Sequence, residues 1–201
     1  MSTASKYDGM WWWLRALAGP LVRLLLRPEV KGRERLPASG PMLFVSNHEA
    51  WWDIPLIGYA APRPVRFMAK SELFRNRFIG GFLRKGGAFP VRRGEPDRDV
   101  FRTVHDAFTD GDIVAIFLQG HRQAELADAK AGAGRIAIVE SAPTVAVAIR
   151  GTREWRLGKR AQIVFGEPRV YEKGERRPGE AYRETADELL EQIRGLRDGG
   201  S

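Results

Sequence analysis

A histidine and an aspartate five residues apart, His48 and Asp53, follow directly on an apolar run of the chain. Imidazole takes up a proton near neutral pH, and it does so productively only when one tautomer and one orientation are held. A carboxylate bonded to the far ring nitrogen supplies both, as in the His–Asp half of a catalytic triad. The same pair is also consistent with a helix-capping aspartate beside a hydrogen-bonded loop histidine. The spacing therefore predicts either a general base with its orienting group or a local structural contact.

No side chain near this pair is an obvious nucleophile. Ser46 lies two residues before His48, and the chain contains no cysteine, which excludes disulfides and is compatible with a reducing compartment. A histidine base would therefore act on a hydroxyl that belongs to a substrate, and this favours transfer of a group to an alcohol. The three histidines of the chain show no metal-binding spacing, so no metal site is predicted.

The elements on either side of the pair must position it. Residues 42–46 read as a buried strand and Ile54 begins the next element, so the pair lies where a strand ends and a helix starts. Further strands are predicted at 29–32, 65–69, 88–91, 113–117, 144–149 and 162–165. Helices are predicted at 54–61, 71–83, 97–109, 134–141 and 179–196. The alternation predicts a single α/β domain over 29–198, with a mixed, largely parallel central sheet flanked by helices.

The segment 10–27 precedes this domain and is strongly apolar, yet it carries several arginines. It is too short and too charged for a membrane span, which needs about 20 predominantly apolar residues. Arg15 and Pro20 interrupt it too early for a secretory signal. Tryptophan prefers the depth of the lipid headgroups, and arginine reaches phosphates from there. Residues 1–28 are therefore predicted to form an amphipathic helix in the membrane interface, kinked or divided at Pro20, with an ordinary core helix as the alternative.

The net charge of +8 is concentrated between residues 63 and 93. This stretch holds a single acid, Glu72, and nine basic residues: Arg63, Arg66, Lys70, Arg75, Arg77, Arg84, Lys85, Arg92 and Arg93. Such a patch suits a phosphorylated substrate, anionic lipid headgroups or nucleic acid. No nucleic-acid recognition motif accompanies it, and the apolar segment before the domain favours lipid. A membrane surface with anionic lipids is therefore the predicted partner, and nucleic acid is not.

Four short blocks follow one another between about Val30 and Pro168, most of the chain. They are Asn47-His48-x4-Asp53, Phe89-Pro90-Val91-Arg92, Lys130-x-Gly132-x3-Ile136-Ala137 and Phe165-Gly166-Glu167-Pro168. In this order they resemble the 1-acyl-sn-glycerol-3-phosphate acyltransferase family, the lysophosphatidic acid acyltransferases and their relatives. The family's first block is NHx4D and its second ends in a phosphate-binding arginine. A single block is weak support, whereas four in the family's order identify the chain as a member.

One further block departs from the family's pattern. Where the family usually has Phe-Pro-Glu-Gly-Thr-Arg-Ser, the chain reads Phe-Leu-Gln-Gly-His-Arg-Gln over residues 117–123. Gln119 thus replaces an acceptor-only carboxylate by a neutral amide that also donates. Ala146 stands where a proline is common, and His121 either faces the site or is a plain loop residue. The departure at Gln119 bears on which acceptor the chain takes.

The resemblance implies a glycerol-3-phosphate acyltransferase-like fold and acyl transfer to a lysophospholipid, most often 1-acyl-sn-glycerol-3-phosphate, giving phosphatidic acid. The donor would be acyl-CoA or acyl carrier protein acting as co-substrate, with no cofactor. His48 is then expected to be the base and Asp53 its orienting group. The expected substrate-binding residues are Arg92, Gln119, Gly120, Arg122 and Lys85, with the two arginines holding the phosphate and Gly120 or Gly87 offering backbone amides to the oxyanion.

Two alternatives to this activity stay open at the level of sequence. The acceptor is another lipid, such as glycerol 3-phosphate, a different lysolipid or a lipid alcohol, or the chain is a non-catalytic lipid-binding relative. In each case the resemblance and the apolar first segment predict a peripheral or monotopic protein on the cytoplasmic face of the cell membrane.

Overall fold

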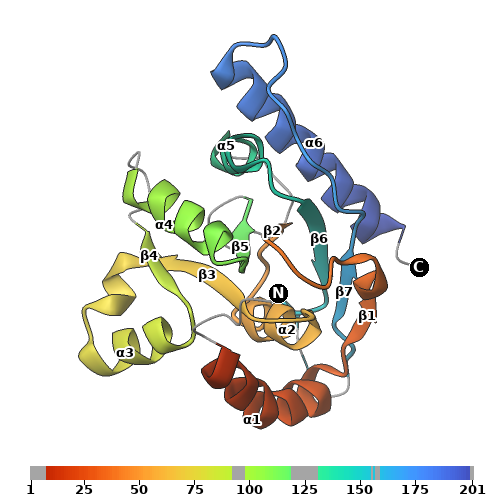
Figure 1. Ribbon diagram of the computed structural model, residues 1–201. Coiled ribbons are helices and arrows are strands. Elements are labelled where there is room, and N and C mark those ends of the chain that lie inside the picture. Colours follow the sequence, from red (N-terminus) through yellow and green to blue (C-terminus); the bar gives the residue numbers. More distant parts are fainter. Residues whose placement is uncertain (1–7, 92–97, 119–130, 155, 157–158, 200–201) are drawn as a thin grey trace.

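The computed structural model describes residues 8–91, 98–118, 131–154, 156 and 159–199 (Figure 1). The strands are β1 (Glu29–Lys31), β2 (Met42–Ser46), β3 (Val65–Lys70), β4 (Phe89–Val91), β5 (Ile113–Phe117), β6 (Thr144–Arg150) and β7 (Gln162–Phe165). The α-helices are α1 (Asp8–Leu26), α2 (Asp53–Ala60), α3 (Arg77–Lys85), α4 (Arg98–Thr109), α5 (Ala131–Glu140) and α6 (Pro178–Asp198). Short 3-10 helices lie at η1 (Arg33–Arg35) and η2 (Ser71–Phe74).

All of these strands belong to one sheet, in the order β1-β7-β6-β2-β5-β3-β4. Within the described part of the chain, neighbouring strands run parallel except for β6 and β7, which are antiparallel. The predicted α/β domain with a mixed, largely parallel sheet is confirmed.

Helices cover both faces of this sheet (Figure 1). On one face, side chains such as Leu43 of β2 pack in a cluster with residues of α4, α5 and α6. On the other face, Phe44 of β2 packs with residues of α1 and α2. A strand buried on both faces is apolar at every position, not only at alternate ones. This is why the continuous apolar runs 42–46 and 113–117 predicted β2 and β5 with the bounds that the structure shows.

Strand β2 lies between β5 and β6 and ends at Ser46, which pairs with Phe117 of β5 and Val147 of β6. Parallel strands bring their carboxyl ends to the same edge of a sheet. The chain segments that leave β2, β5 and β6 therefore meet at one place. His48 and Asp53 lie on the first of these segments.

The segment 71–83, predicted as one helix, forms two elements. The short helix η2 ends at Phe74, and α3 begins at Arg77. Between them the Asn76 side chain accepts hydrogen bonds from the backbone N–H groups of the two residues after Arg77. An asparagine in this position caps a new helix, so the chain restarts there instead of continuing the first turn.

Helix α1 runs from Asp8 to Leu26 with Pro20 inside it, so the proline does not divide the helix into two. Val22 and Leu26, on the side of α1 turned toward the sheet, are buried. None of the helices in the described ranges has both the length and the apolar character needed to cross a bilayer.

Helices α5 and α6 pack closely against each other at Gly134. A Cβ atom at this position would lie 2.0 Å from the backbone oxygen of Tyr182 in α6. Because that atom belongs to a helix backbone, it cannot move aside as a flexible side chain would. Gly132, two residues earlier in α5, has no atom within 4 Å of the corresponding Cβ position.

These two glycines make a matched pair for a stability test. Gly134→Ala is expected to lower the free energy of unfolding by about 1–3 kcal/mol, because the added methyl group forces the helices apart. Gly132→Ala is expected to leave it unchanged or to raise it by up to about 1 kcal/mol, since alanine is the better helix former. Urea unfolding of both variants measures the difference. Equal stability of the two variants would contradict the close packing of α5 on α6.

Candidate active site

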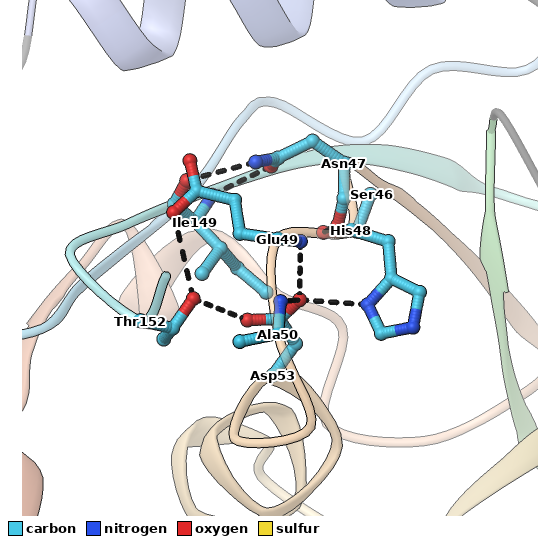
Figure 2. Close-up of polar contacts among 8 residues, drawn as sticks. All are labelled: Ser46, Asn47, His48, Glu49, Ala50, Asp53, Ile149 and Thr152. Atoms are coloured by element: carbon cyan, nitrogen blue, oxygen red, sulfur yellow. Dashed lines mark hydrogen bonds and ion pairs between the residues drawn. The ribbon is translucent and has the colours of Figure 1, made fainter. Parts of the chain in front are cut away.

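His48 and Asp53 are in direct contact at the carboxyl edge of the sheet (Figure 2). His48 Nδ1 lies 2.7 Å from Asp53 Oδ2, and the side chains are 5% and 0% exposed. Because a carboxylate only accepts, Nδ1 is the donor, and Nε2 of the neutral ring is left as an acceptor. Figure 2 shows this second ring nitrogen turned away from the other residues of the network. The structure thus brings the two residues together in the geometry that a general base requires.

Asp53 is held by the loop that precedes it. The backbone N–H groups of Glu49 and Ala50 donate to Asp53 Oδ2 across 2.6 and 2.9 Å. Asp53 is also the first residue of α2, where the helix dipole favours a negative charge. The carboxylate of Asp53 therefore does both things that the sequence allowed. It makes a local structural contact with the backbone of the loop, and it orients the ring of His48.

Thr152 completes the hydrogen bonding of this carboxylate from a distant part of the chain. Its Oγ1 atom donates to Asp53 Oδ1 across 2.5 Å, and its side chain is buried. Both oxygens of Asp53 are thereby bonded, so the carboxylate cannot rotate away from His48 without losing a partner. The sequence reasoning missed Thr152. A signal was present, because Thr152 follows β6, the parallel neighbour of β2, and so lies at the same edge of the sheet.

Asn47 fixes the backbone immediately before the histidine. Its Nδ2 atom donates to the carbonyl oxygen of Ile149, and its Oδ1 atom accepts from the N–H of Ile149, both across 2.8 Å. A side-chain amide offers one donor and one acceptor side by side, as a peptide group does. Asn47 therefore continues the pairing of β2 with β6 past the end of β2 and holds the start of the loop in place.

The face of the His48 ring is covered by Phe117, the last residue of β5. The two rings are stacked, with their centroids 3.8 Å apart and an angle of 12° between their planes. The following residue, Leu118, donates its backbone N–H to the carbonyl oxygen of Ser46 across 2.9 Å. The imidazole is thus fixed by a hydrogen bond at its edge and by an aromatic ring on its face.

Glu49 connects the loop to the C-terminal helix α6. Its Oε1 atom lies 3.6 Å from Nη2 of Arg197, whose carbonyl oxygen accepts a hydrogen bond from Arg150 across 2.8 Å. Burial raises the pKa of the Glu49 carboxyl, the guanidinium of Arg197 counteracts part of that effect, and the charge of Asp53 adds to it. A second buried carboxyl therefore lies beside Asp53, and it forms an ion pair with Arg197 of α6.

An apolar cavity of ≈ 260 Å³ opens beside the loop, between α1, α2, β3 and α3. Ile54 and Pro55, which directly follow Asp53, belong to its wall. Most of the remaining wall is apolar, and Arg15 is the single formally charged residue among the described ones that line it. The cavity thus brings a space suited to a hydrocarbon group next to the helix that begins at Asp53.

The other residues singled out in the sequence are only partly placed. Lys85 is the last residue of α3 and is exposed. The residues Arg92, Gln119, Gly120, His121 and Arg122 lie outside the described residues. Phe117 contacts His48, and Leu118 bonds to Ser46. The block at 117–123 therefore begins at the site.

The arrangement suits removal of a proton from a bound hydroxyl group. The hydroxyl groups nearest to His48 in the network are already engaged, since Ser46 donates to the carbonyl oxygen of Asn47 and Thr152 donates to Asp53. Within the described ranges, no cluster of three or more His, Cys, Asp or Glu side chains is placed to hold a metal ion.

Comparison with known proteins is consistent with this chemistry. A family model described as acyltransferase matches residues 27–150. The 1-acyl-sn-glycerol-3-phosphate acyltransferase of Bacillus subtilis is 37% identical over 154 residues, which cover 73% of the chain and 77% of that protein. The lyso-ornithine lipid O-acyltransferase of Pseudomonas aeruginosa is 34% identical over 110 residues, which cover 54% of the chain and 40% of that protein.

The fold has a counterpart among solved structures. The crystal structure of the 1-acyl-sn-glycerophosphate acyltransferase PlsC from Thermotoga maritima superposes with a TM-score of 0.73. The match covers 94% of this chain and 81% of that one, at 19% sequence identity. At this identity the match shows that the fold is shared.

The hydroxyl group of Thr152 can be tested apart from the shape of its side chain. Thr152→Val leaves Asp53 Oδ1 buried without its donor and is expected to lower the free energy of unfolding by about 1–3 kcal/mol. Thr152→Ser keeps the hydroxyl and is expected to lose less than half as much. Urea unfolding at neutral pH provides both values. A valine variant as stable as the serine variant would show that the hydrogen bond to Asp53 contributes nothing to the fold.

Proposed function

The chain belongs to the acyltransferase family and is an O-acyltransferase, and we propose that it acylates the free hydroxyl of a lysophospholipid. The proposed acceptor is 1-acyl-sn-glycerol-3-phosphate, which would give phosphatidic acid, and the proposed donor is acyl-CoA or acyl carrier protein as co-substrate, with no cofactor. The observation that carries the proposal is the buried contact between His48 and Asp53. The name of the Bacillus subtilis relative supports the choice of acceptor.

In the proposed mechanism His48 is the general base. Its Nε2 atom takes the proton of the acceptor hydroxyl as that oxygen bonds to the thioester carbonyl carbon. The carbon–sulfur bond then breaks, and the thiolate leaves with the proton that His48 returns. Asp53 stabilises the imidazolium that forms between these two steps.

Direct transfer from donor to acceptor fits the residues around His48. The chain has no cysteine, and the hydroxyls of Ser46 and Thr152 are bonded to other groups. A covalent acyl-enzyme therefore has no evident nucleophile in the described part of the site. Holding both substrates at once turns the reaction into an intramolecular step, which is where much of the rate acceleration would arise.

The substrate phosphate needs cations, and the basic residues of the sequence offer them. By resemblance, Arg92 and Arg122 would hold the phosphate through bidentate hydrogen bonds, with Lys85 as a further cation. Backbone amides at Gly120 or Gly87 would bind the oxyanion. The apolar cavity beside Asp53 would take an acyl chain, because a hydrocarbon group gains most from such a wall.

Both substrates carry acyl chains, so the site is proposed to work at a membrane surface. Helix α1 supports this placement, since it leaves large apolar side chains exposed: Trp12, Trp13, Leu17, Leu21 and Leu24. Its Arg15 lies 5.0 Å from the ring centre of Trp11 and 5.6 Å from that of Trp12. Tryptophan and arginine together favour the depth of the headgroups. The protein would then be peripheral on the cytoplasmic face of the cell membrane, attracted by anionic lipids.

A second candidate differs only in the acceptor. Gln119 stands where the family usually has a glutamate, and the Pseudomonas aeruginosa relative is named for a lyso-ornithine lipid. A lysolipid with a headgroup other than a bare phosphate would suit a neutral amide that both donates and accepts. The chemistry at His48 would be the same.

The role of His48 predicts a large loss of rate on its removal. His48→Ala is expected to lower turnover of acyl-CoA with lysophosphatidic acid by about 100- to 10,000-fold, the usual contribution of a general base. His105→Ala is the control, because His105 is an exposed residue of α4 that pairs with Glu140. Turnover of the His105→Ala variant should equal that of the unchanged protein. Steady-state release of free CoA measures both, and turnover of the His48 variant within a factor of a few of the control would overturn the mechanism.

The role of Gln119 is tested by acceptor choice. Gln119→Glu is expected to change the ratio of kcat/KM between lysophosphatidic acid and a lyso-ornithine lipid by about tenfold or more, because the group facing the acceptor gains a charge. Competition between the two acceptors for one acyl-CoA gives the ratio directly. If this ratio stays the same while overall activity is retained, the residue at position 119 does not determine the choice of acceptor.

A further inference from the structure

Helix α3 leaves three large apolar side chains in solvent. Phe78 is 79% exposed, Ile79 is 49% exposed and Phe82 is 58% exposed. With 3.6 residues per turn, these positions fall on one side of the helix. Among the described residues, most of the large apolar side chains left exposed lie on just two helices, α1 and α3. A soluble surface seldom gathers such groups on one short helix without a partner.

The fold itself turns this side of α3 outward. A Cβ atom at Gly80 would lie 2.7 Å from the backbone oxygen of Phe74, so the helix packs against the protein through Gly80. Leu83 and Phe82 reach the wall of the apolar cavity. Phe78 and Ile79 do not contribute to that wall, and no reaction step proposed above uses them.

Exposed cations lie on α3 and directly before it. Arg75, Arg77, Arg84 and Lys85 are all exposed, and Glu72 is the single acid between residues 63 and 93. Arg77 lies over the ring of Phe78, 5.7 Å from its centre. Large apolar side chains next to cations match a bilayer surface, where hydrocarbon lies beneath a layer of anionic phosphates.

Helices α1 and α3 share the apolar cavity. Trp11 and Val22 of α1 line it from one side, and Phe82 and Leu83 of α3 line it from another. Figure 1 shows both helices in the lower part of the molecule, away from α5 and from most of α6. A flat bilayer that met the exposed residues of α1 would therefore have α3 close by.

We propose that α3 is a second membrane-inserting element, which places Phe78, Ile79 and Phe82 among the acyl chains while its arginines bind the phosphates of anionic lipids. The protein then docks through two helices, with the apolar cavity between them facing the membrane. This inference rests on the membrane placement proposed above, and it adds the residues of a second contact. An acidic protein such as an acyl carrier protein, or a second copy of the chain, is the competing occupant of this surface.

The absence of cysteine from the chain allows a direct test. Phe78→Cys carries a single environment-sensitive label on α3, and Val139→Cys, at an exposed position of α5, carries the same label as a control. Both proteins are mixed with vesicles of equal parts phosphatidylglycerol and phosphatidylcholine, with a quencher attached to the acyl chains. We expect the α3 label to shift its emission to shorter wavelength and to be quenched. The α5 label should do neither.

The outcomes separate this inference from the proposed function. If the protein sediments with the vesicles and turns over its substrates while the α3 label stays exposed to water, α3 does not insert, whereas the function stands. If active protein fails to sediment, membrane placement and the α3 contact are both overturned. If the label shifts without vesicles, either with protein concentration or on addition of an acyl carrier protein, the surface binds protein instead and the inference is wrong.

A second variant pair measures the contribution of the side chains. Phe78→Ser combined with Ile79→Ser is expected to weaken partitioning into the same vesicles by about tenfold or more, given the apolar area that each side chain would bury. Val139→Ser combined with Val170→Ser removes comparably exposed apolar groups elsewhere and should leave partitioning unchanged. Turnover of both on a water-soluble short-chain acceptor should equal that of the unchanged protein. Equal partitioning of the two pairs would overturn the inference.

Discussion

The hydrogen bond between His48 Nδ1 and Asp53 Oδ2 is the contact on which the rest of the site depends. It holds one tautomer and one orientation of the ring, and without either the second nitrogen could not accept a proton from a substrate. The sheet supplies the rigid edge that this bond needs. Strand β2 brings the loop to that edge, and β5 covers the ring with Phe117. The segment that follows β6 brings Thr152 to the far oxygen of the carboxylate.

The surroundings of this bond explain how one buried carboxylate is held in place. Asp53 accepts hydrogen bonds from two backbone amides, one imidazole and one hydroxyl. Such bonds replace the hydrogen bonds to water that burial removes. The ion pair between Glu49 and Arg197 also connects helix α6 to the loop.

Sequence reasoning succeeded where the determining pattern is local or repeated. The central strands are apolar at every position, and His48 and Asp53 lie in one loop, so both could be read directly from the chain. It failed where a contact joins distant segments, since Thr152 lies 99 residues from Asp53 and only the parallel register of β6 on β2 brings it there. It also failed at Asn76, because one side chain capping a helix is a weak signal within an apolar and basic stretch.

The most direct measurement is the turnover of Asp53→Asn with acyl-CoA and a lysophospholipid. The asparagine keeps the size of the side chain, and the backbone N–H groups of Glu49 and Ala50 keep its carbonyl oxygen against His48 Nδ1. It carries no negative charge, however, so it cannot stabilise the imidazolium that forms when His48 takes a proton. Turnover is expected to fall by about 1,000-fold or more while the variant stays folded, as judged by its circular dichroism. A folded variant that keeps a tenth or more of the original turnover would contradict the role of Asp53 in stabilising a histidine base.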